Sequence, residues 1–315
     1  MSRQMIEKYI VQAGIPRTKD SQWLVVDPAN GSDSNDGFSF KMPLKTLEEA
    51  EDRCVANRHD CVLYAAGASA NNLAAALTWD KSYTHLIGLC APTMVGQRSR
   101  IFQKSTLTGA SPLLTISASG CIFRDLYIFQ GVNDATSLIN VSVTGGRNFF
   151  QNVHFAGGGH TAQAIDGGAS LLLNGGAENT FDGCTIGVDT VPALTGMVGL
   201  LLDGDAKRNI FRNCNFTMYA GHTGAAFVEV VDSAGFDRYI LFDHCRFIND
   251  SVGYAMASAF VIPAGMGSQT HRLLLDSCMF VGSTKLDASD RGILYGNMNA
   301  VTAADLSGVA VAMHV

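Results

Sequence analysis

Hydrophobic and polar residues alternate along a short phrase that occurs six times in the middle of the chain. The phrase begins with a large apolar residue, has apolar residues at positions four and six, and is usually polar at positions two and five. The copies are residues 123–128, 150–155, 181–186, 211–216, 242–247 and 275–280. Alternation at a period of two is typical of a β-strand with one buried face. We therefore predict one strand per copy, with positions four and six buried and a bend at position one.

The spacing of the copies predicts how these strands are arranged. Successive copies begin 27, 31, 30, 31 and 33 residues apart, and a repeat of this length is typical of a solenoid. A second apolar series keeps step with the first, at 113–116, 138–141, 171–173, 200–202, 227–230, 260–262 and 293–295. Two or more strands per coil, joined by Gly, Asn and Asp, predict an all-β, single-stranded parallel β-helix.

The beginning of the chain does not carry the repeat. Residues 1–22 are predicted to form a short N-terminal arm with a helix that must dock on a partner or on its own solenoid. The apolar residues on one side of that helix are Met5, Ile6, Tyr9 and Ile10. Residues 23–55 are expected to hold an opening strand, a turn and a helix that starts near Pro43 and caps the solenoid core. Residues 56–315 would then form the parallel β-helix and a C-terminal closing segment.

The chain has eight cysteines, and the repeat suggests what most of them do. The fourth position of the phrase is occupied by Cys184, Cys214, Cys245 and Cys278. Earlier copies have Leu and Val there, so we predict a buried stack of small apolar side chains. A disulfide and a metal site are the alternatives, although zinc ligands at short spacing are absent. Because the start of the chain lacks the apolar core of a signal peptide, we expect folding and assembly in a reducing cytoplasm.

The amino-acid composition limits the classes of partner that the chain is expected to bind. Charged residues make up 16% of the chain, hydrophobic residues 47%, and the net charge is −6. No run of about 18 apolar residues is present, so we expect no membrane span. The absence of a basic block argues against nucleic acid as a partner. Low charge is compatible with flanks that are buried against other copies of the chain or against another protein.

The segment after the arm has a more specific likeness. It reads Val26-Asp-Pro, Asn30-Gly-Ser-Asp, Asn35-Asp-Gly37 and Pro43-Leu-Lys-Thr-Leu-Glu-Glu-Ala50. This phrase resembles the start of right-handed parallel β-helix proteins of the pectate-lyase-like superfamily, and is common in phage tailspikes and other virion proteins. The resemblance implies a right-handed solenoid and, by family habit, a homotrimer. It leaves function open, because this fold hosts lyases, hydrolases and structural proteins alike.

Candidate catalytic residues follow from what cleavage of a glycosidic bond requires. A glycosidase needs two carboxylates that face one groove. If the chain is an enzyme, the candidates are Asp203 and Asp232, which end matching strands one coil apart, and the nearby Asp205. Asn174 stands before them in the same column, which favours the alternative that these residues cap turns. A lyase of the superfamily would use an Arg or Lys base beside acidic calcium ligands, and no outward arginine has such neighbours in the sequence.

One acidic loop is a candidate metal site. The run from Asp33 through Asn35 and Asp36 to Gly37 gathers oxygen ligands of the kind that calcium prefers. It lacks the twelve-residue spacing and the closing Glu of an EF-hand. The alternative is a plain turn, because Asn, Asp and Gly tolerate left-handed backbone. We predict no cofactor.

These features together favour a structural virion protein that is not an enzyme. We expect a capsid decoration or cement protein of a tailed phage, located in the virion and assembled in the host cytoplasm. Its N-terminal arm and solenoid flank would bind the major capsid protein or another virion protein. The alternatives are a tailspike- or fibre-associated protein and a polysaccharide-degrading β-helix enzyme, either a lyase or a glycoside hydrolase. The presence of only two tryptophans leaves few obvious stacking platforms for a sugar.

Overall fold

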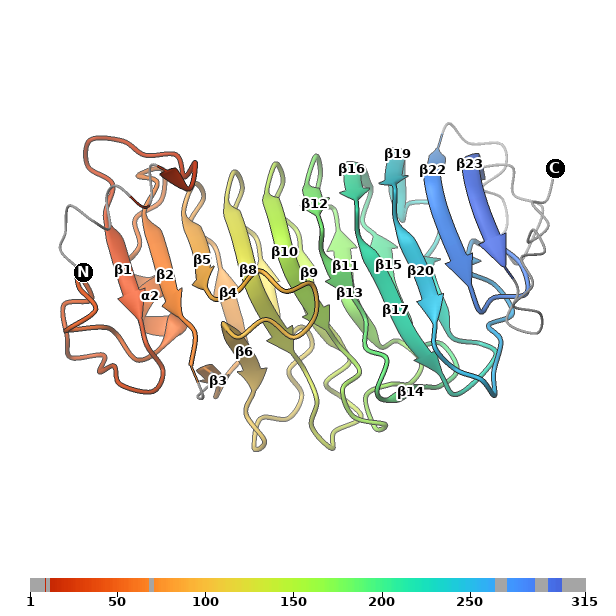
Figure 1. Ribbon diagram of the computed structural model, residues 1–315, viewed down its shortest axis with the longest axis horizontal. Coiled ribbons are helices and arrows are strands. Elements are labelled where there is room, and N and C mark those ends of the chain that lie inside the picture. Colours follow the sequence, from red (N-terminus) through yellow and green to blue (C-terminus); the bar gives the residue numbers. More distant parts are fainter. Residues whose placement is uncertain (1–8, 10–11, 68–70, 264–270, 287–293, 302–315) are drawn as a thin grey trace.

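The chain coils into a parallel β-solenoid in which the strands follow one another from β1 at one end of the molecule to β23 at the other (Figure 1). The computed structural model describes residue 9, residues 12–67, 71–263 and 271–286, and the backbone of residues 294–301. Every strand pairing in this part of the chain is parallel and joins strands of successive coils. The predicted single-stranded parallel β-helix is confirmed.

Two sheets form the walls of the described solenoid, one of 16 strands and one of seven. One row of the larger sheet contains β1 (Trp23–Val26), β2 (Cys61–Ala65), β5 (His85–Leu89), β8 (Ile122–Phe129), β10 (Phe149–Ala156), β12 (Thr180–Asp182), β16 (Ala206–Arg212), β19 (Phe236–Asp243), β22 (Arg272–Val281) and β23 (Leu294–Val301). Its other strands are β3 (Asn71–Leu73), β6 (Arg100–Gln103), β13 (Thr185–Ile186), β14 (Pro192–Ala193), β17 (Asn215–Ala220) and β20 (Arg246–Asn249). The smaller sheet contains β4 (Leu77–Trp79), β7 (Leu114–Ile116), β9 (Ile139–Val143), β11 (Ala169–Asn174), β15 (Val198–Asp203), β18 (Ala226–Val230) and β21 (Phe260–Val261).

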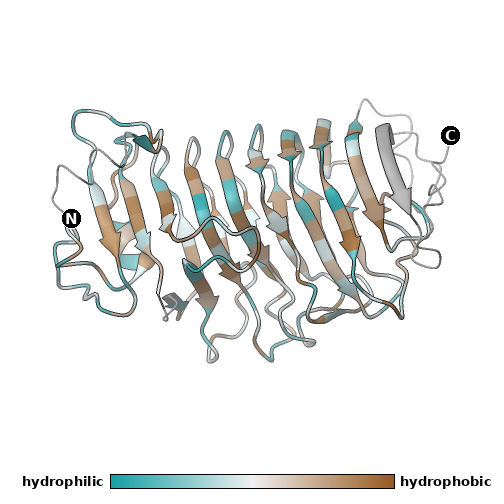
Figure 2. Ribbon diagram, viewed as in Figure 1, coloured by the Kyte–Doolittle hydropathy of each residue, from teal (hydrophilic) through white to brown (hydrophobic). Residues whose placement is uncertain are grey.

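Each copy of the repeated phrase bends at its third position. The residues there have φ between 51° and 61°: Asp125, Asn152, Gly183, Asn213, His244 and Ser277. Such left-handed backbone is rare outside glycine and is tolerated best by Asn and Asp. The predicted bend at position one is therefore wrong, because that residue lies within a strand and its side chain faces the core. The prediction that positions four and six are buried is confirmed. Figure 2 shows brown hydrophobic and teal hydrophilic residues alternating along the strands.

The first position of the phrase builds a column of stacked rings. From Phe123 through Phe150, Phe181 and Phe211 to Phe242, neighbouring ring centroids are 4.4 to 5.2 Å apart and neighbouring planes differ by 4° to 15°. All five side chains are buried. The cysteines of the fourth position are buried beside them, and all eight cysteines lie in the described residues without a disulfide. The predicted apolar cysteine stack is confirmed.

A second internal column consists of asparagines that stand two residues before three of the copies. Asn148, Asn179 and Asn209 are buried. The Oδ1 of Asn179 accepts the backbone N–H of Asn148 at 2.9 Å, and the Oδ1 of Asn209 accepts that of Asn179 at the same distance. Their Nδ2 groups donate to backbone carbonyls, that of Asn179 to Gly145 at 3.1 Å. This ladder satisfies backbone groups where the coil turns, and the alternation pattern gave no indication of it.

A short helix, α2 (Leu47–Arg53), closes the N-terminal end of the core with the buried side chains of Leu47 and Ala50. The predicted capping helix is present but begins later than Pro43. Its N-cap is Thr46, whose side-chain oxygen accepts the N–H of Glu49. The described part of the chain contains no helix with the length and apolar character needed to span a membrane.

The N-terminal arm lies on its own solenoid. Ile15 is buried against Trp23 and Ile87, on the outer face of β1 and β5. Of the residues predicted to bind a partner, Tyr9 is described, whereas Met5, Ile6 and Ile10 lie outside the described residues.

Candidate functional site

The loop between β5 and β6, residues 90–99, crosses the outer face of the 16-stranded sheet in front of β8 and β10 (Figure 1). We call it the crossing loop. The N–H of Gly96 donates to Nδ1 of His154 at 3.1 Å, and the hydroxyl of Thr185 donates to the carbonyl of Met94 at 2.7 Å. The loop is therefore anchored on strands that lie 58 and 91 residues away in the sequence.

His154 holds the crossing loop as a neutral imidazole. Its Nε2 lies 2.9 Å from the carbonyl of Gly187 and must carry the hydrogen, since a carbonyl only accepts. Its Nδ1 is then the acceptor for Gly96. Burial lowers the pKa of His154 from 6.5 to about 4, although the bond to Gly187 opposes the change. Protonation of His154 at Nδ1 would remove the acceptor of the Gly96 N–H and set two N–H groups against each other.

We expect the anchoring of the crossing loop to be lost in acid. Because the folded-state pKa of His154 is depressed, its contribution to stability is complete above about pH 6.5 and disappears as the pH falls through about 4. The free energy of unfolding should fall by about 3 kcal/mol over that range from this residue. Denaturant unfolding at several pH values measures the change, and His154→Gln, which keeps one acceptor and one donor, should flatten the slope. His85 also has a lowered pKa and is present in both proteins, so its contribution cancels in the comparison. If stability falls equally with pH in the unaltered protein and the variant, His154 does not have this role.

An open cleft of about 550 Å³ lies between the crossing loop and the N-terminal arm. We call it the repeat cleft, because positions two and three of the first three phrases form its floor. Its lining residues are Tyr9, Pro92, Met94, Arg124, Asp125, Gln151, Asn152, Asp182 and Gly183. Arg124, Gln151 and Asp182 are paired in register on β8, β10 and β12. Their side chains therefore project from one face of the sheet.

Asp125 is the most perturbed carboxyl group of the repeat cleft. Its Oδ1 accepts the Nδ2 of Asn152 at 2.6 Å, and its Oδ2 lies 3.8 Å from Nε of Arg124. Burial raises the pKa of Asp125 above its ordinary value and outweighs the hydrogen bond and the positive charge, which both lower it. A carboxyl group with a raised pKa in a cleft is suited to proton donation.

Asp182 is the second carboxyl group of the repeat cleft. Its Oδ2 lies 3.1 Å from Nη2 of Arg212. Asp182 is two coils from Asp125. Since neighbouring strands are about 4.8 Å apart, the two residues are about 10 Å apart across the sheet. Sequence reasoning missed this pair, because it searched strand ends and one column at a time.

The N-terminal arm contributes to one wall of the repeat cleft. Arg124 donates from Nη1 to the carbonyl of Ala13 at 3.1 Å. The side chain of Tyr9 is hydrogen-bonded to Arg124, and burial raises the pKa of the tyrosine. Tyr9 therefore touches its own solenoid at the cleft.

A group of partly exposed aromatic rings lies on β6 and β8. The centroid of Phe102 lies 5.5 Å from that of Tyr127 and 5.1 Å from that of Phe129. All three side chains are partly exposed. Such rings can stack on the apolar face of a sugar. The count of tryptophans in the sequence did not reveal these rings, which come from phenylalanine and tyrosine.

The predicted carboxylate pair of the smaller sheet is not in register. Leu202 pairs with Val230, which sets Asp203 beside Val231 and leaves Asp232 one residue further along. The expected alignment of the two aspartates is therefore wrong by one position.

Both carboxylates accept hydrogen bonds from their own turns. The Oδ1 of Asp203 accepts the N–H of Gly204 at 2.7 Å, and that of Asp232 accepts the N–H of Ala234 at 2.7 Å. Asp205 has φ 61° and donates its backbone N–H to the carbonyl of Ala234. These contacts match the turn-capping interpretation.

The acidic loop before α2 binds a guanidinium group. The carbonyls of Asp33 and Asn35 accept Nη2 and Nη1 of Arg53 at 2.7 and 2.6 Å. The Oδ1 of Asp33 accepts the N–H of Thr46 at 3.0 Å, and Asp36 caps a turn of its own. Within the described residues, no group of three or more His, Cys, Asp or Glu side chains could hold a metal ion.

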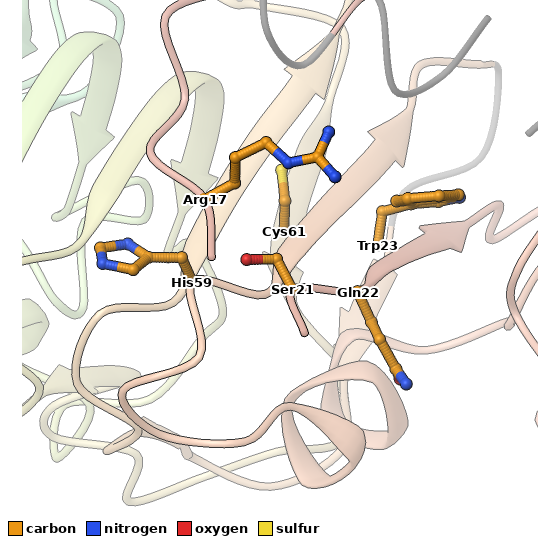
Figure 3. A pocket seen from close by; sticks show the side chains of 6 residues that line it. All are labelled: Arg17, Ser21, Gln22, Trp23, His59 and Cys61. Atoms are coloured by element: carbon orange, nitrogen blue, oxygen red, sulfur yellow. The ribbon is translucent and has the colours of Figure 1, made fainter. Parts of the chain in front are cut away.

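A much smaller hollow lies between the arm and the first strands (Figure 3). Its lining residues are Arg17, Ser21, Gln22, Trp23, His59 and Cys61. The volume of about 10 Å³ has room for no more than one water molecule. Burial raises the pKa of Cys61 to about 12, so its thiol is not a reactive nucleophile. This hollow cannot admit a substrate.

Comparison with known proteins gives structural likeness only. No protein-family model matches the sequence, and no curated protein matches it significantly. An aspartate-to-alanine mutant of a pectin methylesterase in complex with a hexasaccharide matches with a TM-score of 0.62 and 16% identity, over 95% of this chain and 92% of that chain. A pectate lyase matches with a TM-score of 0.56 and 13% identity, over 92% of this chain and 69% of that chain. The pectin methylesterase from Aspergillus niger matches with a TM-score of 0.54 and 14% identity, over 95% of this chain and 93% of that chain.

At this identity the likeness shows the fold alone, a parallel β-helix like that of the matched pectin methylesterases and pectate lyase. The prediction that the chain is not an enzyme is contradicted, because the matched structures are polysaccharide-processing enzymes. That prediction relied on finding no convincing active site in the sequence. The comparisons give no support to a phage capsid protein. The virion location, the capsid partner and the homotrimer stay untested predictions.

Proposed function

We propose that this protein is a polysaccharide-processing hydrolase and that the repeat cleft is its active site. The observation that carries the proposal is the pairing of Asp125, whose pKa is raised by burial, with Asp182 in the same open cleft. The fold likeness to pectin methylesterase and pectate lyase supports it. The partly exposed rings of Phe102, Tyr127 and Phe129 on β6 and β8 give a saccharide an additional surface on which to stack.

The chemistry we infer is glycosidic hydrolysis. Protonated Asp125 donates its proton to the glycosidic oxygen, and the bond from that oxygen to the anomeric carbon breaks. Asp182 takes a proton from the water molecule that attacks the anomeric carbon, so one water is consumed for each bond broken. Inverting enzymes hold their two carboxyl groups about 6.5–9.5 Å apart to leave room for this water. Two coils of the solenoid set the backbones of Asp125 and Asp182 about 10 Å apart, slightly beyond the upper end of that range, so the two side chains have to lean toward each other.

The neighbouring groups of the repeat cleft hold the acid and the substrate. Asn152 fixes the carboxyl group of Asp125 through its 2.6 Å hydrogen bond. Arg124 and Gln151 offer N–H donors to sugar hydroxyls from the same face of the sheet. Because Asp125 must be protonated to act, the rate should fall as the pH rises through its raised pKa.

A panel of polysaccharides incubated with the full chain tests the proposal. Asp125→Asn and Asp182→Asn should each lower turnover of the active substrate by about 10²–10⁴-fold. Asp243→Asn is the matched control, because it occupies position two of a later phrase outside the cleft. If an alcohol is released and the polysaccharide chains are not shortened, the reaction is ester hydrolysis and the inferred glycosidic cleavage is wrong. Full activity in both cleft variants would overturn the assignment of the site.

A further inference from the structure

A second open hollow lies at the base of the crossing loop, and its charged lining is entirely cationic. Its volume is about 530 Å³. The lining residues are Ala66, Gly67, Cys90, Ala91, Arg98 and Arg100. We call it the arginine hollow.

The two arginines face the same side of the chain. They are two residues apart where β6 begins, and the side chain of Ser99 between them is buried and donates to the carbonyl of Tyr64 at 3.1 Å. Arg98, in the bend before β6, and Arg100, the first residue of β6, both line the arginine hollow. The guanidinium carbon of Arg100 lies 6.0 Å from the ring centroid of Phe102, a contact that restrains it.

Neither arginine has a carboxylate partner within the described residues, and the buried Nε of Arg100 makes no hydrogen bond there. Most other arginines of the described chain are ion-paired, namely Arg53, Arg58, Arg124, Arg147, Arg208, Arg212 and Arg238. A guanidinium group that lines an open hollow without a carboxylate partner can bind an external acceptor through its terminal N–H groups.

The arginine hollow is close to the repeat cleft. Cys90 lines the hollow and donates from its thiol to the carbonyl of Asp125 at 3.4 Å. The crossing loop lies between the two openings, since Ala91 and Arg98 line the hollow while Pro92 and Met94 line the cleft. The two openings therefore adjoin the same loop.

We propose that Arg98 and Arg100 form a subsite for an oxyanion of the bound saccharide: a carboxylate, a sulfate ester or a phosphate ester. Guanidinium groups bind such anions with two parallel N–H donors. The substrate class is then an anionic polysaccharide, with its charged group in the hollow and the reacting bond in the cleft. The identity of the ligand as a substrate rests on the proposed function, whereas oxyanion binding does not.

Binding of oligosaccharides of equal length to the full chain tests the subsite. The probes are a polyuronate, a sulfated, a phosphodiester-linked and a neutral oligosaccharide, measured by calorimetry at two salt concentrations. Arg98→Gln with Arg100→Gln should weaken binding of at least one anionic probe by 10-fold or more and leave the neutral probe unchanged. The probe that is affected identifies the oxyanion. Arg238→Gln, at an exposed arginine paired with Asp237, is the control and should change nothing.

Three outcomes would overturn the subsite: no anionic preference in the unaltered protein, unchanged binding in the double variant, or equal loss for the neutral probe. If the double variant fails to fold, Arg98→Gln alone, at an exposed side chain, gives the same comparison. Repeating the titrations with Asp125→Asn, and assaying turnover for every variant, tests the two proposals separately. If the unaltered protein binds anionic probes but turns none of them over, the subsite stands and the proposed function is rejected. If turnover occurs and is the same in the arginine variants, the proposed function stands and the subsite is rejected.

Discussion

Replacing Phe181 by alanine is expected to lower the free energy of unfolding by about 3–5 kcal/mol. The ring is fully buried in the middle of the phenylalanine column. It stacks on Phe150 at 4.6 Å and on Phe211 at 4.4 Å, with planes within 7° of parallel. Removing it deletes two stacking contacts and leaves a cavity that rigid strands on both sides cannot close. Denaturant unfolding followed by circular dichroism measures the loss.

Two further variants show whether packing is the cause. Phe181→Leu should cost less, because Leu275 already occupies this column beside Phe242. Phe38→Ala removes a ring that is 45% exposed and should change stability by no more than about 0.5 kcal/mol. A loss below about 1 kcal/mol for Phe181→Ala would contradict the interpretation of the column as a main source of stability.

Replacing Asn179 by alanine is expected to cost about 2–6 kcal/mol. The change leaves the buried N–H of Asn148 without its acceptor and the carbonyl of Gly145 without its donor. Each buried polar group that loses its partner costs about 1–3 kcal/mol. The loss should also be local, so hydrogen exchange at the amide of Asn148 should speed up more than exchange in the adjoining strand β10.

Asn30→Ala is the control for this experiment, since its exposed side chain bonds only the nearby Asp27 among the contacts described. We expect its effect to stay within about 0.5 kcal/mol. Unchanged exchange at Asn148 in the Asn179 variant would show that the ladder contributes nothing to the turn.

The candidate site shows why sequence reasoning reached the fold but not the cleft. Asp125 and Asp182 differ in repeat position and stand in different copies of the phrase, so no single column contains both. The bend at position three brings them onto one face, and its sequence is too varied for a pattern to reveal it: Asp, Asn, Gly, Asn, His and Ser. Burial, which raises the pKa of Asp125, also depends on segments far along the chain.

The sequence by itself determined the solenoid, its capping helix and the buried positions four and six. It could do so because stacked coils place the same repeat position in every layer, so a local period and a repeat length together fix the core. Only the tertiary structure decided where the candidate site lies. The crossing loop reaches strands 58 to 152 residues away, and the arm folds back onto β1 and β5. Contacts of that separation leave no period in the sequence, and they create both the repeat cleft and the arginine hollow.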